Sequence, residues 1–115
     1  MDRSLMTDTL LGRLPGVELP YDTGAGHVLV GKEAAAVFVH FSERTEVGQH
    51  SHGAQWGAVL SGSMLLELGG VKTQLGPGGW YDIPPGVEHG AVVEAGTVLI
   101  DLFDEPDRFP VSGAG

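Results

Sequence analysis

Short runs of apolar residues alternate with glycine- and proline-rich turns along most of the chain. The turns recur roughly every seven to ten residues, and each run between them has the length of a β-strand. Valine, leucine, isoleucine and aromatic side chains dominate these runs, which are residues 56–60, 64–68, 71–75, 80–83, 89–93 and 97–103. Many short strands at even spacing are typical of an all-β sandwich or barrel, and the pattern predicts that fold class.

Residues 71–75 show the two-residue period of a strand, with Val, Thr and Leu on one face and Lys and Gln on the other. Residues 27–30 and 34–41 are predicted to be further strands. The second of these begins with three alanines, which would also suit a helix. The β-branched and aromatic residues that follow at once favour the pleated surface of a sheet instead.

The first 20 or so residues lack a clear period. We expect this stretch to be an arm that packs loosely or joins the sheet of a neighbouring chain. The predicted domain organisation is therefore an N-terminal arm, residues 1–25, followed by a single barrel domain, residues 26–115.

Composition narrows the class of protein. The 115 residues suit one domain, and a hydrophobic content of 42% is enough for one core. The absence of cysteine excludes disulfides, thiolate metal ligands and a thiol nucleophile. The net charge is −9, and the sequence has no cluster of lysine or arginine that could bind a phosphate backbone. No nucleic-acid partner is therefore expected. The chain shows no apolar stretch typical of a membrane helix or signal peptide, so we expect a cytoplasmic protein with no membrane partner.

Two of the five histidines, His50 and His52, are one residue apart. In a strand, residues i and i+2 share a face, so both imidazoles would project together and could reach one metal ion. Imidazole suits Zn, Cu, Fe and Ni, although two histidines alone also fit a polar loop. A third histidine, His89, follows a Pro-Pro-Gly turn that ends one strand and fixes the start of the next. That stiff corner suits a ligand that must meet two others.

With these residues in place, the chain resembles the cupin superfamily, whose small barrels carry two sequence motifs. The second motif, G-x5-P-x-G-x2-H, is matched at Gly78, Pro84, Gly86 and His89. Val93 stands where an asparagine often follows. The resemblance spans roughly residues 36–103 and implies an all-β double-stranded β-helix, the cupin or jelly-roll barrel.

The first cupin motif, G-x5-H-x-H-x3,4-E-x6-G, is matched less closely. His50 and His52 supply its two histidines, and Gly62 supplies its closing glycine. Counting back across six residues from Gly62 reaches Gln55, where the family has a glutamate. Only two residues separate His52 from Gln55, and the opening glycine is displaced to Gly48.

By this resemblance, His50, His52, Gln55 and His89 form a divalent-metal site inside the barrel, with Fe, Mn, Ni, Zn or Cu as the ion. A carboxylate would cancel one unit of the ion's charge, whereas an amide oxygen cancels none. We therefore expect the ion to be held less tightly and to act as a stronger Lewis acid. In the alternative interpretation the histidines are barrel residues that bond only to water, and the shortened spacing turns Gln55 away.

Other side chains are candidates for lining a pocket beside this site. Trp56 and Trp80 are either core aromatics or one wall of the pocket. His40 is either a barrel histidine with its hydrogen bonds satisfied or a pocket acid or base. Tyr81 and Tyr21 could each donate a proton, although nothing in the sequence selects either. Catalytic residues stay unassigned.

Fold and metal do not fix a reaction, because one scaffold hosts many chemistries. One hypothesis is a metal-dependent enzyme acting on a small, oxygen-rich organic molecule, of the dioxygenase, isomerase or lyase type that occurs on similar cupins. The other is a non-catalytic binding module for a metal or small ligand. A single small barrel leaves sheet edges uncovered and similar cupins are commonly dimers, so a homodimer is expected.

Overall fold

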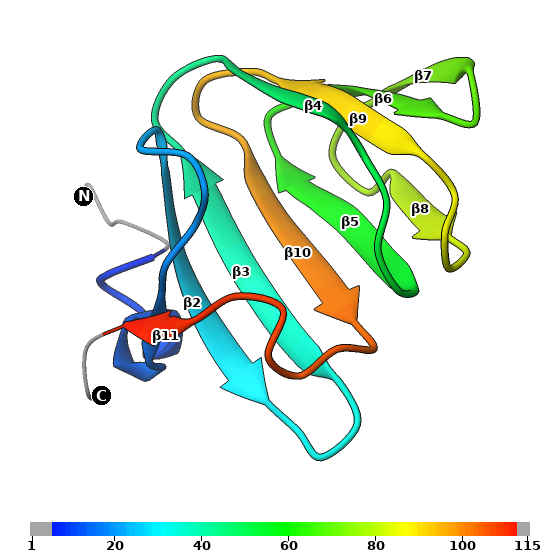
Figure 1. The fold of residues 1–115 in the computed structure, drawn as a ribbon. Coiled ribbons are helices and arrows are strands. Elements are labelled where there is room, and N and C mark those ends of the chain that lie inside the picture. Colours follow the sequence, from blue (N-terminus) through cyan, green and yellow to red (C-terminus); the bar gives the residue numbers. More distant parts are fainter. Residues whose placement is uncertain (1–5, 113–115) are drawn as a thin grey trace.

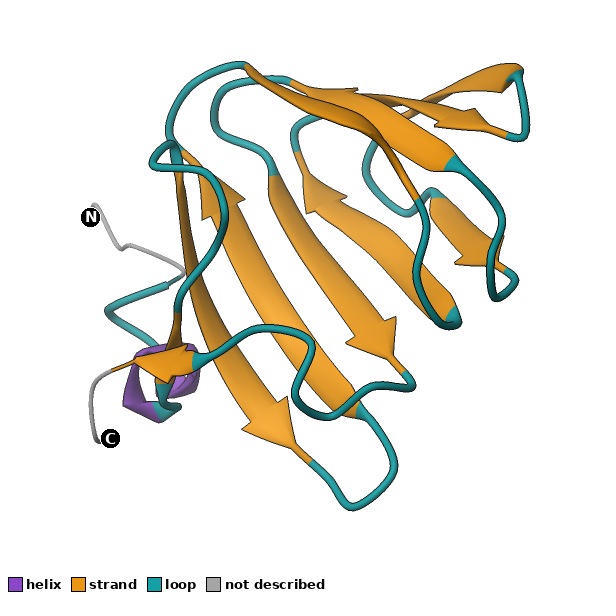
Figure 2. Cartoon of the chain, in the orientation of Figure 1, coloured by secondary structure: helices purple, strands orange, loops and turns teal. Residues whose placement is uncertain are grey.

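The computed structural model describes residues 6–112 and consists almost entirely of β-strands (Figures 1 and 2). A short 3-10 helix, η1 (Leu10–Arg13), precedes the strands. The strands are β1 (Gly16–Val17), β2 (Gly24–Val30), β3 (Ala35–Phe41), β4 (Thr45–His50), β5 (Gln55–Ser61), β6 (Met64–Leu68), β7 (Val71–Leu75), β8 (Trp80–Ile83), β9 (His89–Val93), β10 (Val98–Phe103) and β11 (Val111–Ser112). No helix in the described range is long and apolar enough to cross a membrane.

The strands form two antiparallel sheets that face each other (Figure 1). The large sheet has the order β11-β1-β2-β3-β10-β5-β8, and the small sheet has the order β4-β9-β6-β7. Several pairs of consecutive strands, such as β3 and β4 or β9 and β10, are divided between the two sheets, so the chain winds back and forth between them. This arrangement confirms the predicted all-β, double-stranded β-helix.

Most predicted strands lie where the pattern of apolar runs put them, but β4 was not among them. Val47 is the one apolar side chain of β4, so the sequence has no apolar run there that would predict a strand. The predicted arm also differs in one respect, because β1 pairs with β2 and β11 of its own chain. The division of the chain into an arm and a barrel stays a prediction.

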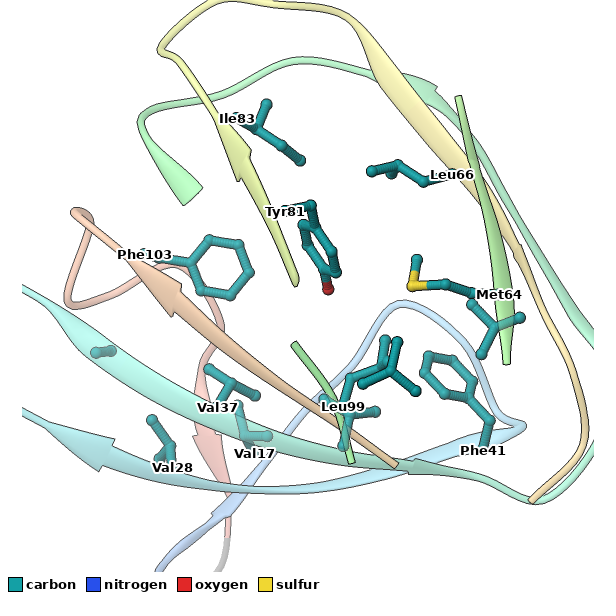
Figure 3. Close-up of a cluster of buried hydrophobic side chains, with 14 residues drawn as sticks. Val17, Val28, Val37, Phe41, Met64, Leu66, Tyr81, Ile83, Leu99 and Phe103 are labelled. Carbon is teal, nitrogen blue, oxygen red and sulfur yellow. The ribbon is translucent and has the colours of Figure 1, made fainter. Parts of the chain in front are cut away.

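The hydrophobic core fills the space between the sheets (Figure 3). Strand β3 shows the reason most clearly, because its residues alternate strictly between buried and half-buried positions. Val37, Leu99, Tyr81 and Phe103 point inward from the large sheet, and Met64 and Leu66 meet them from the small sheet. Each buried side chain of this size contributes about 1.5–3 kcal/mol relative to an exposed one.

The turn between β5 and β6 shows why the first motif closes on a glycine. Gly62 has φ +83°, and a Cβ atom there would run into Thr97. Thr97 is fully buried, and its Oγ1 accepts from the Ser63 N–H and donates to the Ser63 carbonyl oxygen, both at 3.0 Å. Only glycine allows the turn to approach the start of β10 this closely.

Candidate metal centre

Three histidines from two strand ends and one loop meet inside the barrel. His50 ends β4 and His89 begins β9, and the two are partners in the antiparallel register. His52 lies just beyond β4. The ring centroids are 4.3 Å apart for His50 and His89, 4.8 Å for His52 and His89 and 5.2 Å for His50 and His52. One potential ligand atom from each residue lies within 4.8 Å of the others.

Backbone carbonyl groups set the tautomer of all three rings. The Nδ1 atoms of His50, His52 and His89 lie 2.8 Å, 2.9 Å and 2.9 Å from the carbonyl oxygens of Gly48, Gly53 and Val87. Because a carbonyl oxygen only accepts, each Nδ1 carries the proton and each Nε2 keeps its lone pair. This is the arrangement of metal-binding histidines, whose second ring nitrogen donates to a neighbouring acceptor.

The buried Nε2 atoms show whether the three histidines suit a metal ion. Nε2 of His52 and Nε2 of His89 are both buried and have no hydrogen-bond partner within the described residues. A buried polar atom without a partner costs about 1–3 kcal/mol, so such atoms call for an explanation. Two of them beside a third imidazole fit a transition metal ion in their donor chemistry.

Electrostatics keep the site in the state that a metal requires. Burial lowers the pKa of His89, and the charges that His50, His52 and Arg108 would carry lower it further. Burial likewise lowers the pKa of His52, with Arg108 and His50 adding to the effect. The hydrogen bonds of the two rings to backbone carbonyls raise both pKa values, but by less than burial and the neighbouring charges lower them. Both imidazoles are therefore held neutral, as metal ligands must be.

Gln55, at the start of β5, faces the same cavity as the histidines. Its amide nitrogen donates to Oδ1 of Asp101 at 2.9 Å. The acceptor fixes the orientation of the amide, because a carboxylate cannot donate, and leaves the amide oxygen for another partner. Gln55 thus offers the cavity an oxygen donor.

Asp101 is the site residue that the sequence did not reveal. It lies on β10 and is buried, and its Oδ1 accepts both from Gln55 and from the Tyr81 hydroxyl, the latter at 2.5 Å. Burial raises the pKa of Asp101, although these two hydrogen bonds lower it in part. Burial raises the pKa of Tyr81 well above its usual value, and the Asp101 charge adds to the rise. The signal was an aspartate at an inward position of the apolar run 97–103.

Gly57 makes room for this pair. It faces Asp101 on β10 and Tyr81 on β8 in register. A Cβ atom at position 57 would collide with Asp101 Oδ1 and with the Tyr81 hydroxyl. The hydrogen bond between Tyr81 and Asp101 therefore requires glycine at position 57.

These groups open onto one cavity of about 70 Å³ with largely apolar walls. Arg108, from the segment between β10 and β11, also lines it, and the Arg108 Nε atom is buried without a hydrogen-bond partner among the described residues. The Arg108 guanidinium carbon lies 4.8 Å from the ring centroid of Phe109 and 5.8 Å from that of Phe103. The cavity thus combines imidazoles, a carboxyl, a phenol and a positive charge.

The four candidate lining residues fall on two sides of the large sheet. Tyr81 lines the cavity, as does Tyr21. His40, Trp56 and Trp80 do not, because strand alternation points each of them to the outer face, away from Val39, Gly57 and Tyr81 respectively. The sequence could not separate the two faces, since both carry apolar side chains.

The chain is similar in sequence and structure to known cupin proteins. Residues 37–103, more than half of the chain, match the family model of the cupin domain. An RmlC-like cupin from Shewanella frigidimarina is 31% identical, with 84% of this chain and 88% of that chain covered and a TM-score of 0.73. KdgF from Halomonas sp. is 25% identical, with coverages of 79% and 87% and a TM-score of 0.69.

A more distant likeness extends to a larger enzyme. Salicylate 1,2-dioxygenase from Pseudaminobacter salicylatoxidans is 19% identical, with 76% of this chain and 28% of that chain covered and a TM-score of 0.66. At that identity the likeness concerns the fold alone. No curated protein sequence matches the chain.

Proposed function

The chain belongs to the cupin family, and on that premise we propose that it is a metal-dependent enzyme acting on a small, oxygen-rich organic molecule. The observation that carries the proposal is the cluster of three imidazoles, two with buried and unpaired Nε2 atoms, beside the buried Asp101 carboxyl in one cavity. Metal binding alone would not need that carboxyl. Its presence favours an enzyme over a binding module.

His50, His52 and His89 would hold the ion through Nε2, and Gln55 would hold it through its amide oxygen. A bound divalent transition metal would polarise a substrate oxygen or lower the pKa of a bound water. Three neutral imidazoles and a neutral amide leave the full charge of the ion in place, which strengthens that effect. The protein supplies a rigid setting, because backbone carbonyls fix all three rings.

Asp101 is the group best placed to move a proton. Its raised pKa makes it a better base than an ordinary carboxylate, since a catalytic pKa near the working pH is the most effective. Both of its hydrogen bonds arrive at Oδ1, which leaves Oδ2 to accept a proton from a bound molecule. Tyr81 and Gln55 hold the carboxyl in one orientation, as positioning residues do.

Arg108 favours an acidic molecule as the substrate. Its Nε atom is buried and unpaired within the described part of the chain, and it belongs to the lining of the same cavity. A carboxylate is the natural partner for such a guanidinium. A small hydroxy or keto acid would satisfy the guanidinium with its carboxylate and place its remaining oxygens near the imidazoles.

Elemental analysis of the protein as isolated, followed by turnover assays with small hydroxy and keto acids with and without dioxygen, tests the proposal. We expect about one equivalent of a divalent transition metal, and its loss in His89→Ala. We expect Asp101→Asn to keep the metal and to lose about 10²–10⁴-fold in turnover, the range for a general acid or base. Iron in the protein, detected through its complex with nitric oxide, would point to dioxygen chemistry.

Asp82→Asn is the matched control, because it makes the same change on the outer face of β8. It should leave both metal content and turnover unchanged. A protein without affinity for Fe, Mn, Ni, Zn or Cu would contradict the proposal. A protein that binds metal and acids without converting any of them would instead be a binding module.

A further inference from the structure

The two tyrosines of the chain line the same cavity, but their hydroxyl groups differ in what they bind. The Tyr81 hydroxyl donates to Asp101. The Tyr21 hydroxyl has no hydrogen-bond partner among residues 6–112, although the residue is half-buried and lines the cavity. The structure thus separates two phenols that the sequence leaves equivalent: Tyr81 orients the Asp101 carboxyl, and the Tyr21 hydroxyl is left for a bound molecule.

Packing holds the Tyr21 side chain in the cavity wall. Its ring centroid lies 5.8 Å from that of Phe41, with an interplanar angle of 42°. Phe41 is buried at the end of β3, so it supports the Tyr21 ring from the large sheet. Leu19, two residues before Tyr21, also packs on the core and lines the cavity. The segment between β1 and β2 therefore forms part of the cavity wall.

The segment between β10 and β11 adjoins it and supplies Arg108 to the same cavity. The Glu18 backbone N–H donates to the Pro110 carbonyl oxygen at 2.8 Å, and β1 pairs with β11, so the two segments lie side by side (Figure 1). The Arg108 guanidinium packs against the Phe109 ring, which is also part of the cavity lining. Tyr21 and Arg108, which are far apart in sequence, thus belong to adjoining parts of one cavity wall.

The charges around Tyr21 keep its hydroxyl able to donate a hydrogen bond to an anion. Burial raises the pKa of Tyr21, and the Asp101 charge adds to the rise, whereas the Arg108 charge offsets part of it. The phenol is therefore protonated at neutral pH. The Arg108 charge also acts on His52 and His89, so the guanidinium is close both to the phenol and to the imidazoles.

We propose that Tyr21 and Arg108 together bind the carboxylate of the substrate, and that the Tyr21 hydroxyl contributes to the selection of an acid over its neutral amide. This inference rests on the proposed function, in which Arg108 receives a substrate carboxylate. A carboxylate has two oxygens with about four lone-pair sites, so a guanidinium edge leaves sites for a further donor. Tyr21 carries the one side-chain hydroxyl of the cavity wall that has no partner within the described residues.

Binding of hydroxy acids to the metal-loaded full chain tests the proposal. The probes are 2-hydroxy acids from glycolate to gluconate, each compared with its neutral amide, and calorimetric titration gives their affinities. For the acid that the wild type binds most tightly, we expect Tyr21→Phe to lose about tenfold or more in affinity, because a hydrogen bond to a charged group is lost. Affinity for the matching amide should fall much less, since the amide has no negative charge.

Tyrosine absorption in the near ultraviolet gives a second readout, which a merely structural role would not change. A phenol that donates to a carboxylate absorbs at longer wavelength than one without an anionic partner. Addition of the acid to the wild type should therefore produce a tyrosine difference band. The band should be missing in Tyr21→Phe.

Ser42→Ala is the matched control. The exposed Ser42 hydroxyl donates to the Thr23 carbonyl oxygen at 3.2 Å, so the variant removes a hydroxyl next to the same segment but outside the cavity wall. It should leave acid binding unchanged. Tyr21→Phe keeps the ring that packs on Phe41, and circular dichroism and metal content establish that each variant is folded.

The outcomes distinguish this inference from the proposed function. Equal affinities of the wild type and Tyr21→Phe for the acids would overturn the inference and leave the enzyme proposal intact. Equal losses for acid and amide would also overturn it, by assigning the hydroxyl to an oxygen outside the carboxylate. Acid binding that depends on Tyr21, in a protein that converts none of the acids, would uphold the inference and contradict only the proposed activity. Failure of every acid to bind would overturn both.

Discussion

Gly86 donates its backbone N–H to the carbonyl oxygen of His52 at 2.9 Å, so the turn of the second motif is bonded directly to the loop of the first. Gly86 has φ +77°, a conformation that only glycine adopts without strain. Three residues later, His89 begins β9 and faces His50 in register. One hydrogen bond at a glycine thus sets the position of the third imidazole relative to the other two.

Gly86→Ala should therefore damage metal binding as well as stability. We expect a loss of about 1–3 kcal/mol in the free energy of unfolding, since a side chain at positive φ is strained, and about a tenfold loss of metal affinity. Chemical denaturation and metal titration measure the two effects. Gly70→Ala is the matched control, because Gly70 also has positive φ but lies in the turn between β6 and β7. A similar loss of metal affinity in both variants would contradict the prediction.

The all-β class and the three histidines could be predicted from local pattern, whereas the double-stranded β-helix was implied by the resemblance to cupins. Turn residues punctuate apolar runs, and a Pro-Pro-Gly corner fixes His89 from its immediate neighbours. What local pattern cannot tell is which face of a strand looks inward when both faces are apolar. His40, Trp56 and Trp80 are all on strands of that kind, and the structure turns them outward.

Asp101 could not be assigned for a different reason. Its partners, Tyr81 on β8 and Gln55 on β5, are 20 and 46 residues away in sequence. Their meeting depends on the order β10-β5-β8 in the large sheet and on the space left at Gly57. The sequence shows an acid within an apolar run, but only the sheet order shows that a phenol and an amide are there to satisfy it.

Gln55→Glu tests the proposed double role of the amide, as hydrogen-bond donor to Asp101 and as metal ligand. In the metal-free variant, the carboxyl group introduced at position 55 would face the Asp101 carboxyl group. The Gln55 amide nitrogen, which it replaces, now donates to Asp101 at 2.9 Å. Like charges that close raise one pKa and destabilise the ionised pair, so we expect about 1–3 kcal/mol less stability at neutral pH. The added carboxylate should meanwhile increase metal affinity, because it cancels one unit of the ion's charge.

The double variant Gln55→Glu/Asp101→Asn supplies the control for this effect. Asparagine removes the second carboxyl while keeping a similar shape, so stability of the metal-free protein should return most of the way. Thermal unfolding with and without metal measures both quantities. Unchanged metal affinity and an unchanged spectrum of the bound ion in Gln55→Glu would show that residue 55 does not touch the ion.

Gly57→Ala should break the hydrogen bond between Tyr81 and Asp101. The new methyl group would occupy the position of the Tyr81 hydroxyl and Asp101 Oδ1, so these two buried side chains would have to move apart. Overpacking of this kind costs about 1–3 kcal/mol. We expect turnover to fall with it and metal affinity to fall much less, because three of the four proposed metal ligands, the histidines, lie outside β5. Ala58→Gly, on the outer face of the same strand, should leave turnover intact; equal losses in the two variants would contradict a specific role for the space at Gly57.

Acid should destabilise the metal-free protein through His52 and His89. Burial lowers the pKa of both rings below the usual value of about 6.5, which the unfolded chain keeps. Below that pH these two imidazoles bind more protons in the unfolded state than in the folded state. The free energy of unfolding therefore falls as the pH falls. The slope is at most about 1.4 kcal/mol per pH unit for each proton, and it vanishes above neutral pH.

Asp101 acts in the opposite sense, and the two contributions can be separated. Burial raises its pKa, so the folded state binds a proton that the unfolded state has lost, and this group favours folding as the pH falls. Denaturation in Asp101→Asn should therefore show a steeper loss of stability than the wild type as the pH falls toward the ordinary aspartate pKa of about 3.9. A His52→Gln/His89→Gln variant should show a shallower one. If that variant kept the full slope of the wild type, the acid sensitivity would belong to other groups, and the two rings would not be the neutral, buried imidazoles on which metal binding depends.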